Sequence, residues 1–186
     1  MRKNFGAKPW LYPMPVLILG TYNADGTPNA MNAAWGGISE ENEIFVCVSD
    51  DHKTTENLLV TGAFTVSVAT ADTLAAADLV GIVSGNEVPD KLLRTGWHAE
   101  KSAFVNAPLF AELPMALECE VVSYDKECCR LLGRIINVSA DERVLDEKGR
   151  IDAARLAPIV YDPVAHVYRA IGDALGRAFH AGKSLL

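Results

Sequence analysis

The stretch VLILGTYNADGTPNAMNAAW, residues 16–35, constrains the fold more than any other part of the sequence. Its apolar β-type run ends at Tyr22, and Asp25 and Gly26 behind it form a pair that favours a tight hairpin turn. A strand that turns straight back pairs antiparallel, because a parallel partner would need a crossover of a dozen or more residues. Pro28 is tolerated as the first residue of the returning strand. The Gly-Gly pair at 36 and 37 predicts a bulge or a close backbone approach at its end.

Further β-type runs follow, separated by short helical patterns. We expect strands at EIFVCVS (43–49), which reads as buried on both faces, and at AFTVSV (63–68), MALECEVVSY (115–124), CRLLGRIINVS (129–139) and AHVYRAIG (165–172). Within 115–124, Glu118 and Glu120 fall on the face opposite the apolar residues, which predicts a half-buried strand.

Helices are predicted at TTENLLVTG, DTLAAADLVGIVSG, PDKLLRTG and DAARL. The first has a capping hydroxyl at its front and Gly62 as its stop, and the second begins with Asp72 as its N-cap. About seven strands with inserted helices and direct hairpins predict a mostly β fold, with an antiparallel sheet closed into a barrel. The 186 residues are expected to form one domain, residues 1–186.

Composition excludes several classes of function. A hydrophobic fraction of 49% against 22% charged residues is typical of a soluble globular protein, and no apolar run is long enough to span a bilayer. The formal net charge of -7, without a basic stripe, argues against a nucleic-acid partner. The N-terminal residues do not have the pattern of a secretory signal, so we expect a cytoplasmic protein without a membrane role.

Motifs for protein-based catalysis are missing from the sequence. It contains no GxSxG elbow, HExxH, Walker loop or GxGxxG after a strand, so no catalytic residue is assigned. The four cysteines form no CxxC pair, which makes a structural metal site improbable and leaves the metal ligands unassigned. The adjacent Cys128 and Cys129 are either redox-active or small core residues, and the core interpretation is favoured.

The segment SDDHKTTENLL, residues 49–59, places basic and hydroxyl side chains where a helix begins. The first N–H groups of a helix are unpaired and its dipole is positive there, so an anion such as a phosphate is stabilised. Lys53, Thr54 and Thr55 would add charge and donors, whereas Asp50 and Asp51 would repel an anion. From these residues alone, a solvated helix start and a phosphate site both remain open.

Residues of the returning strand offer contacts for a flat ligand. The amides of Asn29 and Asn32 both donate and accept, as the polar edge of a heterocycle requires. Trp35 either stacks on a ring or fills space in the barrel, and Tyr168 in the late strand is similarly ambiguous between a ligand and a core role.

The order of several segments resembles the flavin reductase-like family, and within it the flavoredoxin branch. These segments are YPMPVLILGTYNADGTPNAMNAAWGG, HKTTENLLVTGAFTVSV, SGNEVPDKLLRTGW, NAPLFAELPMALECEV and LLGRIINV, in that order. The resemblance implies an FMN-binding split β-barrel that works as a homodimer and holds FMN noncovalently. Such a protein would take electrons from a nicotinamide donor, NADH or NADPH.

The resemblance also implies which residues hold the flavin. The strand facing the isoalloxazine comprises Asn29, Met31, Asn32, Ala33, Ala34 and Trp35. The phosphate end comprises Ser49, Lys53, Thr54 and Thr55, with Lys91 as a further cationic contact and Tyr168 at the late aromatic position. The family commonly has a histidine shortly before the LGRI strand, whereas this chain has Cys128, Cys129 and Arg130 there.

The resemblance supports two main functions, with a third as the remaining alternative. The first is an FMN-dependent oxidoreductase that passes hydride or electrons from NAD(P)H to flavin or another acceptor. The second is a flavoredoxin-type electron carrier that works between redox protein partners without turning over a small substrate. The third is a split-barrel protein that has lost flavin and binds another ligand. A flavin would also explain the lack of catalytic acids and bases, because the cofactor carries the redox chemistry.

Overall fold

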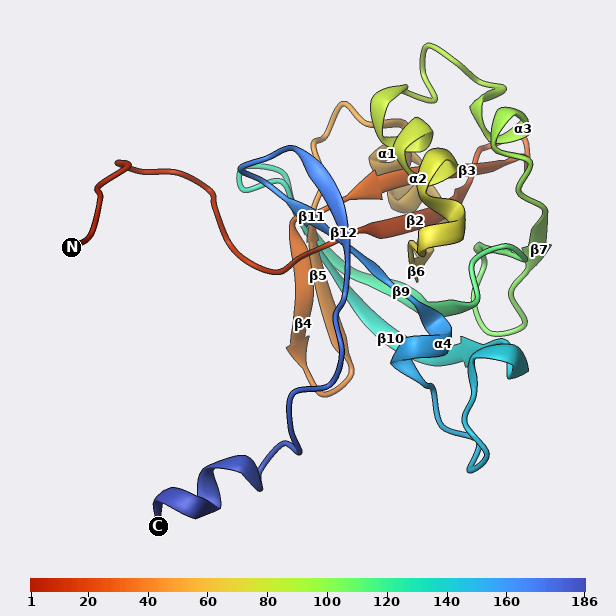
Figure 1. The fold of residues 1–186 in the computed structure, drawn as a ribbon. Helices are drawn as coiled ribbons and strands as arrows, with labels where there is room; N and C mark the ends of the chain where they lie inside the picture. Colours follow the sequence, from red (N-terminus) through yellow and green to blue (C-terminus); the bar gives the residue numbers. More distant parts are fainter.

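The computed structural model describes residues 1–186, leaving aside the side chain of residue 184. Its centre is a seven-stranded sheet that curls into half a barrel (Figure 1). In spatial order the strands are β3 (Pro28–Ala33), β2 (Leu17–Tyr22), β6 (Ala63–Val68), β9 (Met115–Asp125), β10 (Arg130–Ala140), β5 (Glu43–Cys47) and β4 (Gly36–Glu40). All of these neighbours pair antiparallel, as the hairpin at Asp25 and Gly26 predicts.

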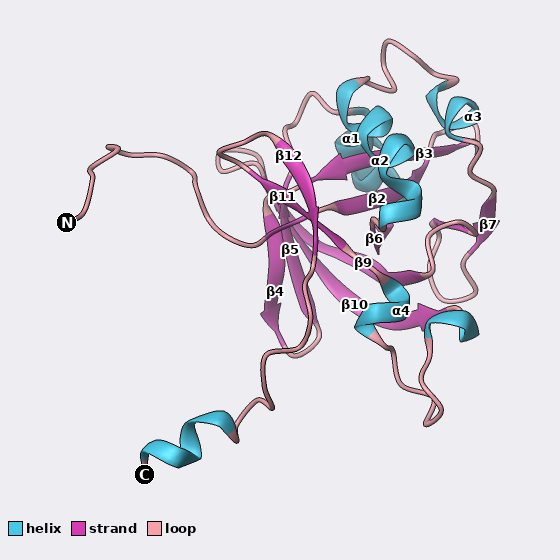
Figure 2. Cartoon of the chain, in the orientation of Figure 1, coloured by secondary structure: helices cyan, strands magenta, loops and turns pink.

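Two smaller sheets complete the β structure. One contains three strands in the order β1 (Met14–Pro15), β11 (Ile159–Asp162) and β12 (Val167–Ala170). The other pairs β7 (Ala99–Lys101) with β8 (Pro108–Phe110). The fold is therefore mostly β with inserted helices, which confirms the predicted class (Figure 2).

The helices are inserted between the strands. They are α1 (Lys53–Thr61), α2 (Leu74–Ile82), α3 (Lys91–Thr95) and α4 (Ala153–Leu156), with 3-10 turns at Ala71–Thr73, Glu142–Val144 and Ala181–Leu185. In Figure 1, α1, α2 and α3 lie beside β2 and β3, and α1 contacts β2 while α2 contacts β3. The end of β5 therefore leads directly into the helix that lies against the first hairpin.

The apolar run in β2 is continuous because both of its faces are covered. Ile18 belongs to the cluster under α2, which also contains Val80 and Trp97. Leu19 belongs to the cluster inside the curled sheet, with Phe64. Successive side chains of a strand point to opposite faces, so a strand buried on both faces needs apolar residues at consecutive positions.

Several predicted elements differ in the structure. The segment EIFVCVS is not buried on both faces, because Ile44 and Val46 enter the inner core while Phe45 and Cys47 are only half-buried. The strands β1, β4, β7, β8 and β11 were not predicted. The predicted close approach at Gly36 is confirmed, since a Cβ there would lie 2.8 Å from the carbonyl oxygen of Phe45.

The predicted helix caps were partly wrong. Helix α1 has His52 at its N-cap without a side-chain cap, although Gly62 ends it in the left-handed conformation as expected. Asp72 lies inside a 3-10 turn, whose capping box joins Thr70 and Thr73, and so it is not the N-cap of the following helix.

The prediction that Glu118 faces solvent was also wrong. Its side chain is 1% exposed and accepts hydrogen bonds from the hydroxyl of Ser102 and, at 2.7 Å, from the amide of Asn137. Ser102, which follows β7, and Asn137 of the neighbouring strand β10 compensate for its burial.

Both termini extend away from the body of the protein (Figure 1). The N-terminal segment exposes Phe5 and Leu11, and the C-terminal segment exposes Leu175 and Phe179. No helix in the described part of the chain has the length and apolar character needed to cross a membrane.

Candidate functional site

The start of α1 offers unpaired hydrogen-bond donors. No side chain caps the helix, and the carbonyl of His52 accepts from the N–H groups of Thr55 and Glu56. The earlier N–H groups of a helix have no intrahelical partner, and the helix dipole is positive there. His52 Nδ1 is also buried without a hydrogen-bond partner among the described residues. A buried unpaired nitrogen is unfavourable, so a polar group from solvent or from a ligand would stabilise this end of the helix.

A cavity of about 270 Å³ opens at this helix start. It is lined by Met31, Asn32, His52, Lys53, Thr54, Val80, Gly81, Ile82, Val83, Ser84, Gly85, Glu87 and Lys91. Pockets for whole ligands usually measure about 300–1,000 Å³. This cavity therefore accommodates one end of a nucleotide, and the rest would extend over the surface.

Aspartates upstream of the helix do not line the cavity. Asp50 forms an ion pair with Lys126 at 2.8 Å, and the carbonyl of Asp51 accepts from the amide of Asn86 at 3.1 Å. Pairing with Lys126 thus reduces the repulsion expected from Asp50, whereas the Asp51 carboxylate lies 4.0 Å from Nε2 of His52.

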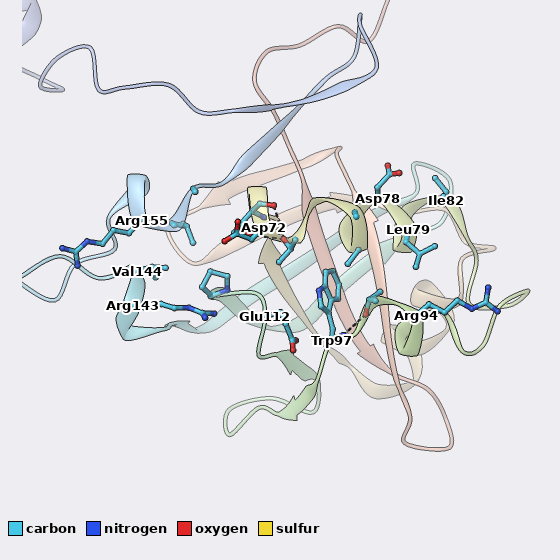
Figure 3. A pocket seen from close by; sticks show the side chains of 18 residues that line it. Asp72, Asp78, Leu79, Ile82, Arg94, Trp97, Glu112, Arg143, Val144 and Arg155 are labelled. Carbon is cyan, nitrogen blue, oxygen red and sulfur yellow. Dashed lines mark hydrogen bonds between the residues drawn. The ribbon is translucent and has the colours of Figure 1, made fainter.

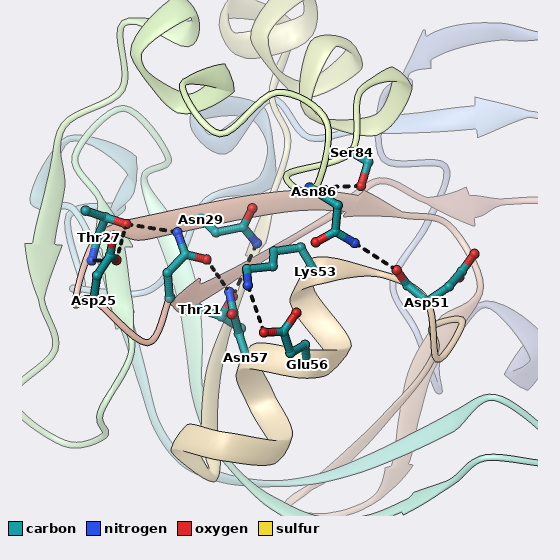
Figure 4. Close-up of polar contacts among 11 residues, drawn as sticks. Thr21, Asp25, Thr27, Asn29, Asp51, Lys53, Glu56, Asn57, Ser84 and Asn86 are labelled. Atoms are coloured by element: carbon teal, nitrogen blue, oxygen red, sulfur yellow. Dashed lines mark hydrogen bonds and ion pairs between the residues drawn. The ribbon is translucent and has the colours of Figure 1, made fainter.

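Lys53 and Lys91 bring positive charge to the cavity in different ways. Lys53 Nζ lies 2.9 Å from a carboxylate oxygen of Glu56, one turn further along α1 (Figure 4). Lys91 is 3% exposed, and its ammonium donates to the carbonyls of Val83 at 3.0 Å and Val80 at 3.4 Å. Burial lowers the pKa of Lys91 to about 8. Lys91 thus binds the carbonyl groups at the end of α2, beside the cavity. Its lowered pKa also means that its charge can change near neutral pH.

A buried amide and hydroxyl network fixes α1 against the first hairpin (Figure 4). Asn29 Nδ2 donates to Thr54 Oγ1 at 2.9 Å and to Thr21 Oγ1 at 3.3 Å. Asn57 Nδ2 donates to the same Thr21 oxygen at 3.1 Å and to Asn23 Oδ1 at 2.8 Å. Asn29, which does not itself line the cavity, therefore positions the start of α1 through its hydrogen bond to Thr54.

The end of α2 and the segment after it close the cavity, because Gly81 and Gly85 there allow a close approach. A Cβ on Gly85 would lie 2.8 Å from Asn29 Oδ1, and one on Gly81 would lie 3.1 Å from the Cβ of Asn32. The amide of Asn32 is fixed from the same side, since it donates to the carbonyl of Ala77 at 3.0 Å.

The predicted site residues are only partly brought together. Those lining the cavity are Met31, Asn32, Lys53, Thr54 and Lys91. Ser49 and Thr55 lie beneath the helix start, where the hydroxyl of Thr55 donates to the carbonyl of Ser49 at 2.6 Å. A phosphate contact by Thr55 or Ser49 stays a prediction, and the Thr55 hydroxyl is already used.

Other predicted residues lie outside the cavity. Ala33 is buried in the inner core, while Ala34 and Trp35 line a separate apolar groove of about 410 Å³ with Trp10 and Phe45. Trp35 is 56% exposed. Contacts of these residues with a ring stay predictions, and a ring reaching Trp35 would have to extend beyond the cavity.

Tyr168 contacts α2 from the strand β12. Its hydroxyl donates to the carboxylate of Asp78 at 2.8 Å. Burial, with that carboxylate as a second cause, raises the pKa of Tyr168 to about 12, so the hydroxyl remains a donor at neutral pH. Its role at a ligand stays a prediction.

Sequence reasoning missed His52 and the segment 81–85 as parts of the cavity wall. His52 sits at the helix start, but the usual N-cap residues are Ser, Thr, Asp and Asn, so a histidine there gives no cap signal. The glycines of the segment have no local feature that reveals which strand they approach.

A larger groove of about 930 Å³ lies between α2, α3 and α4, with Trp97 at its centre (Figure 3). Arg94 and Arg155 point away from Trp97 in this view, and they already bind Asp90 and the carbonyl of Leu145. Among the described residues, the groove is lined by no buried polar side-chain atom that lacks a partner, whereas the cavity at α1 has His52 Nδ1, so the smaller cavity is the better candidate site.

Comparisons with known proteins agree with this architecture. A sequence model described as the flavin reductase like domain matches residues 10–168. The fold is similar to flavoredoxin of Desulfovibrio vulgaris (Miyazaki F), with a TM-score of 0.94, 35% identity and coverage of 98% of this chain and 100% of that one. It is also similar to flavoredoxin from Methanosarcina acetivorans, with a TM-score of 0.89, 27% identity and full coverage, 100%, of both chains.

A more distant structure shares the fold alone. Nitrilotriacetate monooxygenase component B from Bacillus cereus matches with a TM-score of 0.77 and 20% identity, covering 90% of this chain and 89% of that one. Among curated protein sequences, none matches this chain significantly.

Proposed function

Because the chain belongs to the flavin reductase-like family, we propose that it binds FMN and transfers electrons from NADH or NADPH through it to flavin or another acceptor. The observation that carries the proposal is the buried, unpaired His52 Nδ1 at the uncapped start of α1, beside Lys53 and Lys91. This set of donors matches the needs of a phosphate. The cavity takes one end of a nucleotide, as a flavin bound through its phosphate requires.

The residues of this chain would hold and orient the cofactor. The helix start, His52 and Lys53 would bind the phosphate, and Thr54 would be kept in place by Asn29. Asn32, fixed by the carbonyl of Ala77, would present a polar side chain to the ligand beside the segment 81–85. FMN, when bound, supplies the hydride and electron transfer chemistry, which explains why no protein acid or base is needed.

We further propose that the protein acts as a homodimer. The cavity is too small for a whole flavin nucleotide, and Trp35, between β3 and β4, is exposed. A second copy would pack on this side and contact the extended terminal segments. It would cover exposed apolar residues such as Leu11 and Phe179. Exposed apolar surface of this kind typically marks an interaction site.

The cofactor proposal is tested by titrating FMN and riboflavin into the purified protein and following flavin fluorescence. The fluorescence of FMN should be quenched on binding at micromolar concentration. Riboflavin, which lacks the phosphate, should bind more weakly. A protein that quenches neither ligand would contradict FMN binding.

A second candidate is an electron carrier, favoured by the similarity to two flavoredoxins. Steady-state oxidation of NADH and NADPH with added FMN separates the two functions. An oxidoreductase turns over the nicotinamide with free flavin as acceptor. A carrier shows bound FMN but little turnover until a reductase partner is added.

A further inference from the structure

The hairpin between β9 and β10 carries two adjacent free thiols, Cys128 and Cys129. Cys128 is exposed and Cys129 is half-buried. The backbone of Cys129 has φ 52, in the left-handed region that favours glycine. This conformation is unfavourable for a cysteine, so a tight turn alone does not explain why a cysteine is present.

This hairpin is bound to the loop that leads into α1. The carbonyl of Cys129 accepts from the N–H of Val48 at 2.8 Å, and the hydroxyl of Tyr124 donates to the carbonyl of Val48 at 2.9 Å. Lys126 forms its 2.8 Å ion pair with Asp50 in the same loop. We call these contacts the hairpin clasp. Through the clasp, the backbone position of Cys129 constrains the loop that ends at His52.

We propose that Cys128 and Cys129 are a redox-active dithiol that closes to a vicinal disulfide and thereby loosens the cofactor's phosphate site. The oxidant is a peroxide, the class of product that a reduced flavin gives with oxygen. One sulfur attacks the peroxide, whose O–O bond breaks to leave a sulfenic acid and water. The second sulfur then displaces the hydroxyl as a second water, so two thiols and one hydrogen peroxide give one disulfide and two waters.

Ring closure must change the backbone at the clasp. Adjacent Cα atoms are about 3.8 Å apart across a trans peptide, whereas disulfides usually join Cα atoms about 4.4–6.8 Å apart. The linking peptide and the dihedral angles of Cys129 therefore have to shift when the disulfide forms. The carbonyl of Cys129 moves with them and weakens its hydrogen bond to Val48. The effect on FMN rests on the proposed function, whereas the disulfide itself does not.

The surroundings of the pair control how readily it reacts. A hydrogen bond and the charge of Asp125 raise the pKa of Cys128. The thiolate is the reactive form, so Asp125 keeps the resting pair reduced until oxidant accumulates. Asp125→Asn should therefore accelerate disulfide formation at neutral pH.

The disulfide is detected directly by peptide mapping of the full-length protein. Reduced protein is treated with hydrogen peroxide, its remaining thiols are alkylated, and trypsin releases the peptide Glu127–Arg130, which contains only this pair of cysteines. We expect this peptide to lose two hydrogen atoms and escape alkylation, while Cys47 and Cys119 stay alkylated. A link from either residue to Cys47, or an alkylated pair after oxidation, would overturn the proposal.

Cofactor affinity tests the connection to the phosphate site. FMN should bind roughly three- to ten-fold more weakly to the oxidised protein, as expected for loss of one or two hydrogen bonds, and dithiothreitol should restore the affinity. Cys128→Ser should bind FMN equally before and after peroxide, whereas the matched control Cys47→Ser should respond like the parent. A Cys128→Ser variant that still responds, or an oxidised parent with unchanged affinity, would refute the connection. If the reduced parent binds no FMN, the proposed function fails, while the peptide mass still decides whether the dithiol exists.

Discussion

The side-chain amide of Asn29 donates a 2.9 Å hydrogen bond to the hydroxyl of Thr54, joining β3 to the first turn of α1 across 25 residues of sequence. Both residues are buried. This bond fixes the helix start relative to the strand, and the strand and helix together form two walls of the candidate cavity.

Asn29→Ala should lower both the free energy of unfolding and the affinity for FMN. Loss of the amide removes the donor to the buried Thr54 hydroxyl, which costs about 1–3 kcal/mol, whereas the Thr21 hydroxyl keeps its hydrogen bond from Asn57. A double-mutant cycle with Thr54→Val, measured by urea unfolding and FMN titration, gives the coupling energy. The matched control is Asn137→Ala, whose amide binds the buried Glu118 away from the cavity. If the control weakens FMN as much as Asn29→Ala does, the effect is general destabilisation.

Lys53→Ala should weaken FMN binding by roughly ten- to a hundred-fold, because a charge-assisted hydrogen bond contributes about 1.5–3 kcal/mol. Riboflavin should lose little on the same substitution. Glu56→Gln provides the opposite test, because it removes the carboxylate that now pairs with Lys53. That variant should bind FMN slightly more tightly in fluorescence titrations. Equal losses for FMN and riboflavin with Lys53→Ala would show that Lys53 does not act on the phosphate.

FMN affinity should fall as the pH rises from about 7 to 9. Burial lowers the pKa of Lys91 to about 8 in the protein without ligand, and a bound anion favours its protonated form. Binding above this pKa must take up a proton, so one linked group predicts a loss approaching ten-fold across this range. Lys91→Met should abolish the pH dependence in titrations at constant ionic strength. The same slope in the variant would assign the effect to another group.

Lys91 should have the opposite effect on the stability of the protein without ligand, which should increase as the pH rises. The folded pKa of Lys91 lies below the unfolded value, so between about pH 8 and 10 the unfolded state binds more protons. Its contribution to the free energy of unfolding therefore rises with pH in this window. Urea unfolding of the parent and of Lys91→Met across the window measures the difference, and parallel curves would contradict it.

Trp35→Ala should weaken FMN binding while changing the free energy of unfolding of the monomer by about 0.5 kcal/mol or less. Trp35 is 56% exposed, so its truncation leaves no cavity in the core. Trp97→Ala is the control, because Trp97 is 7% exposed and its loss should cost about 3–5 kcal/mol. Chemical unfolding and FMN titration of both variants separate the roles. Unfolding of Trp35→Ala would make Trp35 a core residue.

Gly85→Ala should weaken FMN binding, because the added methyl group would lie 2.8 Å from Asn29 Oδ1 and push the segment 81–85 away from β3. Gly172→Ala adds the same methyl group in open space and should leave binding unchanged. Fluorescence titrations of the two variants provide the comparison. Unchanged binding by Gly85→Ala would show that this segment is free to move without affecting the ligand.

The sequence by itself determined the local elements of this protein. The turn at Asp25 and Gly26, the apolar run of β2 and the stop at Gly62 depend on neighbouring residues only. Local periodicity and turn chemistry therefore predict the antiparallel hairpins, the mostly β class and the place where α1 ends. The edge strand β4 escaped prediction because its outer residues are exposed and carry no apolar alternation.

Only the tertiary structure decided which side chains meet. The order β3-β2-β6-β9-β10-β5-β4 brings segments together that are far apart in the sequence. It places Lys91 and Gly85 beside the start of α1, turns Asp50 toward Lys126 and buries Glu118 against Asn137. These contacts depend on long-range strand pairing and on the burial it produces, and no local pattern encodes either of them. The phosphate-binding potential of SDDHKTTENLL is therefore local, but the walls that make it a cavity come from the fold.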